Sequence, residues 1–352
     1  MPTFTGNLYI NEIFNSLYNM IIGQIVFSDN ISSPFMSLVD RSRVEGSMFG
    51  DTMLYYATNA LNAYDFNPDT EEQTNVLKTH RPPDPNVQAI TIDTFKWIPV
   101  TIDDYFSKRA FTTASAFADF NGVVLEWLRD TKRIYDATTY NTFIGTDESD
   151  IGSQTQTVTL GDNDQINAER IAEKVANILV EMKDVGTDYN DLGFYRAYDP
   201  ADLIVVWNSE YVNNIKKVGL PAIFHKDGLM DKFDENNVLP ARYFGRVNET
   251  DGTATAATRW LKSSNSSGAP TIFAGSEFGT GTYSGGETYE QDGTIICKIM
   301  HKKSVPYMSG FETESEFWNS LNLSRNHYLI FGHNDLEHLS NYPMVTLRAV
   351  KA

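Results

Sequence analysis

The fold is decided by residues 117–143, which read FADFNGVVLEWLRDTKRIYDATTYNTF. Apolar side chains recur in this stretch at steps of three and four, or at sums of those steps, and include Phe117, Leu128 and Phe143. Such spacing places them in one stripe along a helix. A continuous helix of this length would measure about 40 Å at 1.5 Å per residue. That is long for a compact domain, so we expect a helix that acts as a strut.

Candidate ends of this helix lie on both sides of the stretch. Asp103 and Asp104 can cap its first turn and complement the helix dipole. Gly145 suits the position just after the last turn. Gly122 is a candidate for a kink or a break in the middle. We therefore expect one long helix between Asp103 and Gly145 with a single weak point.

Two extended segments precede the helix, over residues 46–64 and 87–102. The second segment alternates polar and apolar side chains over part of its length. Residues 65–86 lie between them and contain four prolines and several charges, which is typical of a polar loop tip. A two-stranded hairpin alone is only marginally stable in water, so we expect this arm to lean on another surface. Residues 8–27 show helical apolar spacing, and this segment must also pack on something.

An α/β module is predicted after the long helix. Strand, helix, strand and helix are expected over 155–160, 171–185, 202–207 and 209–218, with Asp164 or Asn167 starting the first helix and Gly186 ending it. Residues 226–293 are rich in Gly, Ser and Thr and predict surface loops. Strands return over 294–300, 327–331 and 344–350. The fold class is therefore α+β.

The charge balance excludes several classes of partner. The 352 residues hold 46 acidic and 28 basic side chains, a formal net charge of −18. The longest basic cluster, His301-Lys302-Lys303, is too short to follow a phosphate backbone, so binding to nucleic acid is not expected. Residues 17–27 are far shorter than the roughly 20 residues of a membrane span. The N-terminus lacks a basic secretory region, so we expect synthesis inside the cell and no membrane partner.

Few residues suggest chemistry. His333 and His338 flank a polar run, but a spacing of five puts them on different faces of a helix, and polar turn residues are the better interpretation. Cys297 and His301 would share one face of a strand, although a buried thiol is favoured over a nucleophile. The glycine-rich run 275–281 matches no phosphate loop. Helix caps or solvated loops explain the acidic pairs at 71–72, 103–104 and 147–150. We predict no catalytic, cofactor-binding or metal-binding residue.

The order of these elements resembles that of the Hong Kong 97-type major capsid proteins of tailed bacteriophages. The similarity includes Phe143-Ile144-Gly145-Thr146 at the end of the long helix and Gly219-Leu220-Pro221 after the helix–strand–helix unit. It covers element order from about residue 40 to 352. The resemblance implies an N-terminal arm (1–45), an extended E-loop hairpin (46–102), a peripheral domain with the long spine helix (103–164 and 291–352), and an axial domain with a loop-rich insertion (165–290).

The resemblance also implies a function. It predicts a non-enzymatic structural protein without cofactors that self-assembles as pentamers and hexamers into an icosahedral phage head around double-stranded DNA. Scaffolding, portal and decoration proteins are possible partners, and synthesis would take place in the host cytoplasm. The alternatives are a bacterial encapsulin-type nanocompartment shell, another virion component such as a tail or surface protein, and an enzyme that uses Cys297 or the His333–His338 cluster.

Overall fold

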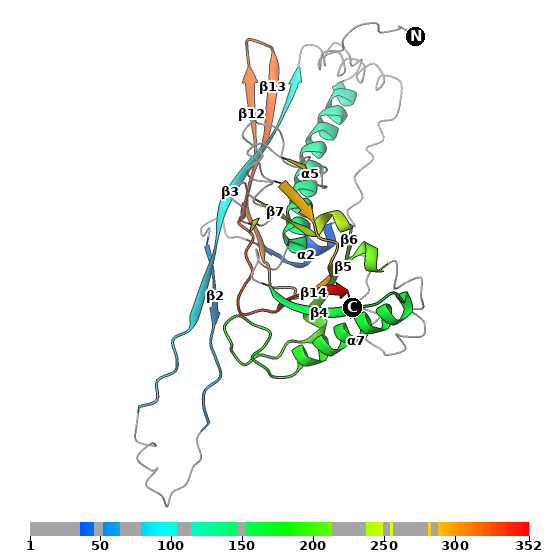
Figure 1. Ribbon diagram of the computed structural model, residues 1–352. Helices are drawn as coiled ribbons and strands as arrows, with labels where there is room; N and C mark the ends of the chain where they lie inside the picture. Colours follow the sequence, from blue (N-terminus) through cyan, green and yellow to red (C-terminus); the bar gives the residue numbers. More distant parts are fainter. Residues whose placement is uncertain are drawn as a thin grey trace, which may run out of the picture.

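The computed structural model describes residues 36–45, 52–63, 79–103, 114–146, 153–212, 237–248, 254–255, 281–282 and 288–351. Two long helices and three β-sheets build the fold (Figure 1). The predicted helix over residues 8–27 lies outside the described residues. So do most of the proline-rich tip and most of the Gly/Ser/Thr-rich region.

The central layer is a five-stranded sheet covered on both faces. Its strands run in the order β4 (Gln154–Leu160), β14 (Met344–Lys351), β11 (Ile295–His301), β5 (Leu203–Asn208) and β6 (Val238–Leu239). Helix α7 (Asp164–Lys183) packs on one face, where Val175 meets Val205 and Trp207. Helix α5 (Ala114–Gly145) and the short α2 (Ser37–Arg41) pack on the other, where Phe143 meets Val206. Burial on two sides explains why β5 and β11 are buried throughout.

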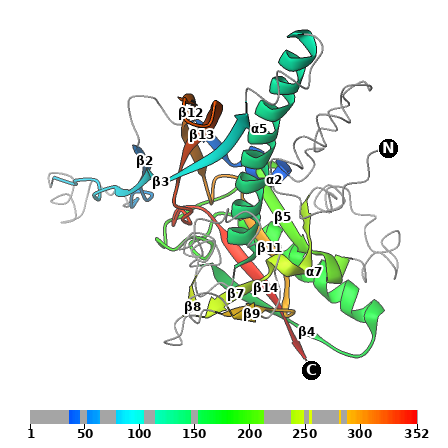
Figure 2. The same cartoon turned by 90° about the horizontal axis from the view of Figure 1, so that it is seen from above.

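A second five-stranded sheet carries the arm away from the body (Figure 1 and Figure 2). Its strands run in the order β1 (Arg43–Glu45), β12 (Tyr307–Asn319), β13 (Ser324–Asn334), β3 (Asn86–Asp103) and β2 (Thr52–Ala57). The long β3 serves two partners, because β2 pairs with its first six residues and β13 pairs with the rest. Beyond these sheets, β8 (Ala254–Thr255), β7 (Gly245–Asn248), β10 (Thr288–Gln291) and β9 (Gly281–Thr282) form a four-stranded sheet.

The long helix is present as predicted, but its weak point and its start are not. The helix is continuous through Gly122, and a Cβ atom at this position would meet nothing within 4 Å. Asp103 is no helix cap, because it is the last residue of β3 and pairs with Ser324. Asp104 lies outside the described residues. At about 1.5 Å per residue, the 32 residues of α5 span about 48 Å, and the helix lies across one face of the second sheet.

The predicted α/β module is confirmed with corrections at its caps. The helix begins at Asp164, the first of the two predicted starts, and its N-cap is Asn163, whose Oδ1 accepts hydrogen bonds from the amides of Gln165 and Ile166. Its C-cap is Asp184, so Val185 and Gly186 lie beyond the helix. Asn208 caps the next helical turn by accepting from the Glu210 amide, and the part of that helix after Val212 lies outside the described residues.

Several elements were not predicted. These are α2, β1 and the 13-residue β12, and both β3 and β13 are longer than expected. The expectation of surface loops over 226–293 is wrong for the described part of that region, which forms the strands β6 to β10. In β12 the alternation is carried by Glu312, Glu314 and Glu316 in place of apolar side chains, so it lacks the usual pattern of a half-buried strand. None of the described helices combines the length and the apolar character needed to cross a bilayer.

Candidate assembly surfaces

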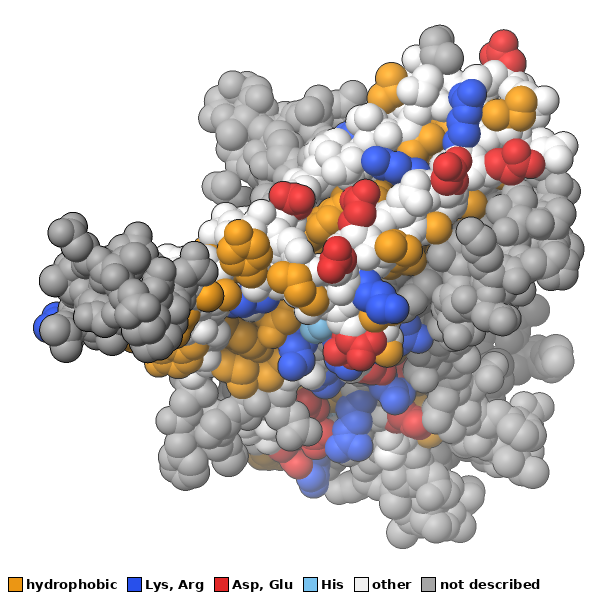
Figure 3. All heavy atoms as spheres, turned by 90° about the horizontal axis from the view of Figure 1, so that it is seen from below, with side chains coloured by type: hydrophobic (Ala, Val, Ile, Leu, Met, Phe, Trp, Pro, Cys, Tyr) orange, Lys and Arg blue, Asp and Glu red, His pale blue; other side chains and the backbone are white. Residues whose placement is uncertain are grey.

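The arm, which we define as β2 with residues 86–92 of β3, has one covered and one uncovered face. Ile90 and Ile92 form a buried cluster with Met308 and Leu339 of the body. The opposite face carries Tyr56, which is 64% exposed, beside the exposed Leu54 and Val87. Exposed apolar side chains in one row on a projecting hairpin indicate a contact surface. Figure 3 shows hydrophobic side chains gathered where the arm joins the body.

A β-bulge at Asp93 exchanges the two faces of β3. Ile92 pairs with Asn334 and Thr94 with His333, so one extra residue lies between the partners. A Cβ atom on Gly332 would meet the side chains of both Ile92 and Phe95, which places those two side chains on one face although they are three residues apart. The uncovered face of the arm therefore points to the α5 side of the sheet, and its covered face points away from α5.

The face of the second sheet that points away from α5 is left largely open by the described residues and carries few charges, and we call it the outer sheet face. It contains Phe95, Trp97 and Pro99 of β3, which pair with Gly332, Ile330 and Tyr328 of β13. Trp97 is 61% exposed, and its ring centroid lies 5.5 Å from that of Tyr328. On β12 the same face carries Thr313, Ser315 and the exposed Phe317. The described residues thus leave an aromatic surface open on the side opposite to the helix.

The turn between β12 and β13 adds a second apolar feature. Leu321 at this turn is 93% exposed, and Leu323 has a φ of 52°. Positive φ is unfavourable for a branched residue other than glycine. The turn therefore holds its leucines outward at a conformational cost, which is typical of a contact site.

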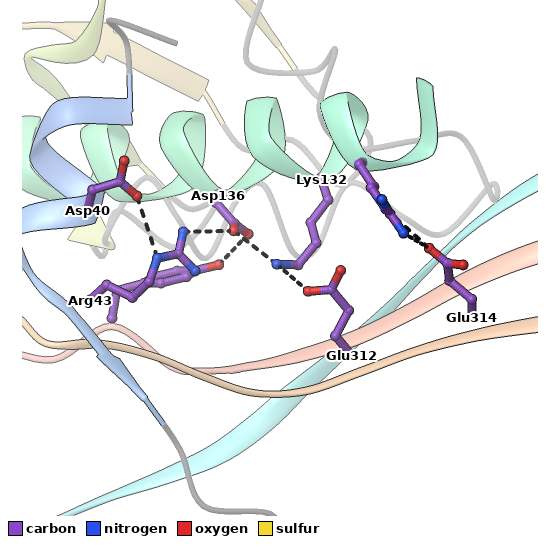
Figure 4. A network of polar contacts seen from close by, with 8 residues as sticks. Asp40, Arg43, Lys132, Asp136, Glu312 and Glu314 are labelled. Carbon is purple, nitrogen blue, oxygen red and sulfur yellow. Dashed lines mark hydrogen bonds and ion pairs between the residues drawn. The ribbon is translucent and has the colours of Figure 1, made fainter. Parts of the chain in front are cut away.

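A chain of charged side chains fastens α5 to the second sheet (Figure 4). Asp136 of α5 is buried and accepts a hydrogen bond of 2.6 Å from the Tyr307 hydroxyl. Arg43 Nη2 lies 3.5 Å from the same carboxylate and Lys132 Nζ lies 3.4 Å from it. Burial raises the pKa of Tyr307 well above its usual value, so this hydroxyl stays protonated and keeps donating. Lys132 also lies 3.1 Å from Glu312 of β12.

The same network continues to the solvent-exposed end of β12. Arg129 lies 3.0 Å from Glu314, and both side chains are largely exposed, so this pair is worth less than the buried one. A cavity of about 700 Å³ opens beside the network, and charged residues of α2, α5 and β12 dominate its lining. Glu312 and Glu314 each face a base of α5, which explains how a strand without apolar alternation is held against a helix, while Glu316 pairs with Arg325 of β13.

The C-terminal end of α5 is held by a buried lysine. Lys298 of β11 is fully buried, and its ammonium group donates a hydrogen bond to the Thr146 carbonyl, just beyond the last helical residue. A cation at this end complements the helix dipole. A Cβ atom on Gly145 would lie 1.9 Å from the Tyr243 carbonyl oxygen, so only glycine lets the 3₁₀ turn Ala241–Tyr243 come this close. Sequence reasoning missed Lys298, although one lysine inside an apolar strand was a visible signal.

The burial of Cys297 argues against a reactive thiol at this position. Its side chain is fully buried among the residues that α7 covers, and burial raises the pKa of the thiol far above its usual value. The thiolate needed for a nucleophile therefore does not form. His301 lies at the end of the same strand, where its Nδ1 accepts a hydrogen bond of 3.1 Å from the Lys303 amide. The Cys–His alternative finds no support in this geometry.

The two histidines of the predicted polar turn lie apart and are already bonded. His333 is a buried strand residue, and its Nδ1 donates to the Asn334 carbonyl over 2.8 Å while its Nε2 accepts from the Tyr135 hydroxyl over 3.0 Å. His338 donates from Nε2 to the Tyr342 carbonyl over 2.9 Å. The expectation of turn residues is thus wrong for His333. Within the described ranges, no three His, Cys, Asp or Glu side chains gather to hold a metal ion.

The remaining candidates contribute no site. The acidic residues at 71–72 and 147–150 lie outside the described residues, as does nearly all of the glycine-rich run 275–281. What the described residues do bring together are exposed apolar surfaces. Such surfaces are typical of a protein that binds other macromolecules.

Comparisons with known proteins agree with this picture. Residues 5–333 match the family described as Phi29-like phage major capsid protein. A chain in the capsid structure of Staphylococcus phage Andhra is similar with a TM-score of 0.66 and 11% identity, covering 93% of this chain and 87% of that chain. A chain in the capsid structure of the cyanophage P-SCSP1u gives a TM-score of 0.53 and 9% identity, covering 94% and 92%. A search of curated proteins gives no match.

At such identities the solved structures show a shared fold, while the family match spans nearly the whole chain. The mixture of helix and strand predicted from the sequence is thereby confirmed as a phage capsid fold. A structural role replaces the enzyme alternative. This protein belongs to the family of Phi29-like phage major capsid proteins and is a structural subunit of the phage head.

Proposed function

We propose that the subunit has the Hong Kong 97-type arrangement, in which the arm acts as an E-loop and α5 acts as the spine helix. In this arrangement the arm of one copy lies on the outer sheet face of the next copy. The observation that carries this proposal is the exchange of faces at Asp93. It leaves the arm uncovered on the α5 side and the sheet uncovered on the other side.

The opposite orientation of these two surfaces has a geometric consequence. Copies in one shell all turn the same side outward. An arm uncovered on one side can then cover a sheet uncovered on the other side without any copy turning over. The arm contributes Leu54, Tyr56 and Val87, and the outer sheet face contributes Phe95 and Trp97. Burying apolar area at about 25 cal/mol per Å² would favour this contact.

The contact is heterologous, since different patches of two identical chains meet. Heterologous contacts close into rings, and we propose rings of five and six subunits in an icosahedral head. The residue division expected from the sequence is part of the same proposal: 1–45, 46–102, 103–164 with 291–352, and 165–290. On this division the peripheral and axial domains share the central sheet, because β5 pairs with β11.

We also propose that the head encloses double-stranded DNA without specific binding. The net charge of −18 disfavours adhesion of the genome to the wall, so DNA would stay free to move. Scaffolding, portal and decoration proteins are proposed partners, and the host cytoplasm is the proposed site of synthesis. Tight binding of duplex DNA by empty shells at physiological salt would contradict the charge argument.

The arm contact is tested with one substitution and a matched control. Trp97→Asp places a carboxylate on the outer sheet face, whereas Val180→Asp places one on a side chain of α7 that is 68% exposed. Both residues are exposed, so both variants should keep the unfolding temperature of the subunit within a few degrees of wild type. Gel filtration and electron microscopy of the expressed chains then report assembly.

We expect shells from wild type and from Val180→Asp, and mainly unassembled subunits from Trp97→Asp. A carboxylate buried at an interface without a partner costs several kcal/mol, which exceeds the margin of a single contact. Normal shells from Trp97→Asp would overturn the assignment of the outer sheet face.

A further inference from the structure

The outer end of the arm, where the chain leaves β2 toward the tip, is held by hydrogen bonds that apolar packing alone does not require. On the β2 side, Arg196 Nη2 donates to the Thr58 carbonyl over 2.6 Å, and the Tyr195 amide donates to Asn59 Oδ1 over 3.0 Å. Thr58 and Asn59 directly follow the end of β2. The loop that carries Arg196 therefore grips the point where the chain leaves the sheet toward the tip.

The β3 side of the arm is gripped by a different loop. Gln88 donates from Nε2 to the His338 carbonyl over 3.0 Å and accepts at Oε1 from the Ser340 amide over 3.1 Å. Each strand of the arm thus has its own anchoring loop. Two anchors on two strands fix a direction, whereas one anchor would allow the hairpin to swing.

Arg196 joins the two loops to each other and to the body. Its Nε donates to Asn341 Oδ1 over 2.9 Å, next to the loop that holds Gln88. Its backbone exchanges two hydrogen bonds, of 2.9 Å and 3.0 Å, with Gly186 just after α7. The planar guanidinium group presents several donors in a fixed geometry, so one side chain holds Thr58 and Asn341 at a set distance.

We propose that Arg196 is a positioning residue that aims the arm in the free subunit, before any neighbouring copy is present. A fully extended chain rises about 3.3 Å per residue, so Ala63 can lie up to about 17 Å beyond Thr58, and a swing of ~10° would then move it by up to about 3 Å. That displacement is enough to misplace side chains on a neighbour. A pre-aimed arm binds without first losing orientational freedom.

This inference rests on the proposed docking of the arm, but its first test does not require assembly. One spin label is placed at Ala63→Cys, beyond the end of β2, and the other at Glu173→Cys on α7. Both positions are exposed. The native Cys297 is fully buried and stays unlabelled in the folded chain. Pulsed dipolar spectroscopy of the unassembled full-length chain then measures the distribution of distances between the labels.

We expect a narrow distribution of distances in wild type and one about twice as broad in Arg196→Ala. Arg196→Lys should give an intermediate width, because lysine keeps the charge but not the planar set of hydrogen-bond donors. Arg170→Ala is the matched control, because Arg170 donates to the Thr159 carbonyl within the body over 3.0 Å. Its distribution should equal that of wild type. Melting curves of all variants confirm that the subunits are folded.

Shell yield gives the second readout. Arg196→Ala should assemble several-fold more slowly than wild type, because only the fraction of arms that point correctly binds productively. An unchanged distance distribution in Arg196→Ala would overturn the positioning role, whatever the yield. A broadened distribution with normal assembly would overturn its importance for shells. Loss of assembly in Trp97→Asp tests the arm contact itself, so the two proposals fail separately.

Discussion

His301 shows how one buried side chain links stability to pH. Burial lowers the pKa of its imidazole to about 4, and the positive Lys302 and Lys303 nearby act in the same direction, while Asp202 opposes them. The Lys303 amide donates to Nδ1, so protonation at that atom would also break a hydrogen bond. The ring stacks on Tyr342 at 4.8 Å, which leaves little room for a hydration shell.

We therefore expect the free energy of unfolding to fall as the pH drops from about 6.5 to about 4, because the unfolded chain binds a proton that the folded chain excludes. The effect of this group is up to about 3 kcal/mol, and it is absent above pH 6.5. His301→Gln should reduce this slope and leave the part that comes from carboxyl groups with a lowered pKa, such as Asp292. Urea denaturation at pH 7 and pH 4.5 measures it, with His327→Gln on β13 as the control. An identical slope in His301→Gln would contradict the assignment.

At the scale of residues, the sequence predicted which side chains are buried better than it predicted their hydrogen-bond partners. The burial of the Cys297 thiol followed from the apolar residues around it in the sequence. The start of α7 at Asp164 was among the predicted starts, but its N-cap Asn163 was not named, because three polar residues in a row all suit an N-cap and only the backbone geometry selects among them. Lys298 was missed because its partner, the Thr146 carbonyl, is 152 residues away along the chain.

At the scale of elements, α5 depends on a narrow contact with the second sheet. Leu128 is buried against Leu329 and Phe331, and Tyr135 continues the same contact. Leu128→Asp should destabilise the subunit by about 3–5 kcal/mol, because a carboxylate would lie in an apolar contact without a partner. Trp127→Asp, one position away and 44% exposed, is the control and should cost far less.

Thermal melting of the unassembled chains measures both variants. A wild-type melting temperature in Leu128→Asp would show that this part of α5 is not held by the sheet. The prediction of α5 succeeded because a single stripe of apolar residues spans many turns. The strand β12 was not predicted because its alternating side chains are glutamates. Their partners, such as Lys132 and Arg129, lie on a helix that is far away in the sequence although it packs on the strand.

At the scale of the molecule, the body and the arm follow different rules. The body is a central sheet covered on both faces, and its apolar runs made it predictable. The arm has one covered face, and its described tip residues 79–85 are all exposed. Its order in the chain was predictable from the prolines between two extended segments. Its direction was not, because that depends on contacts with loops far away in sequence, such as those of Arg196 and Gln88.

Deleting residues 67–85 should therefore leave the subunit soluble and folded but poor at assembly. The described part of this segment, residues 79–85, is exposed, and the deletion spares Gln88, Thr58 and the buried cluster at Ile90. Circular dichroism should show an unchanged melting temperature, while electron microscopy should show few shells. Normal shells from this deletion would contradict the E-loop assignment.

The bulge at Asp93 decides which face of β3 each side chain of the arm occupies. Side chains alternate along β3, so the number of residues between arm and body decides which side of the arm carries Leu54, Tyr56 and Val87. Removing that one residue would restore regular pairing along β3, and the two faces of the arm would exchange sides. The composition and length of the hairpin would hardly change, yet its apolar row would face the opposite side. On the proposed docking of the arm, one residue in the alternation therefore decides whether this row meets a neighbouring copy or solvent.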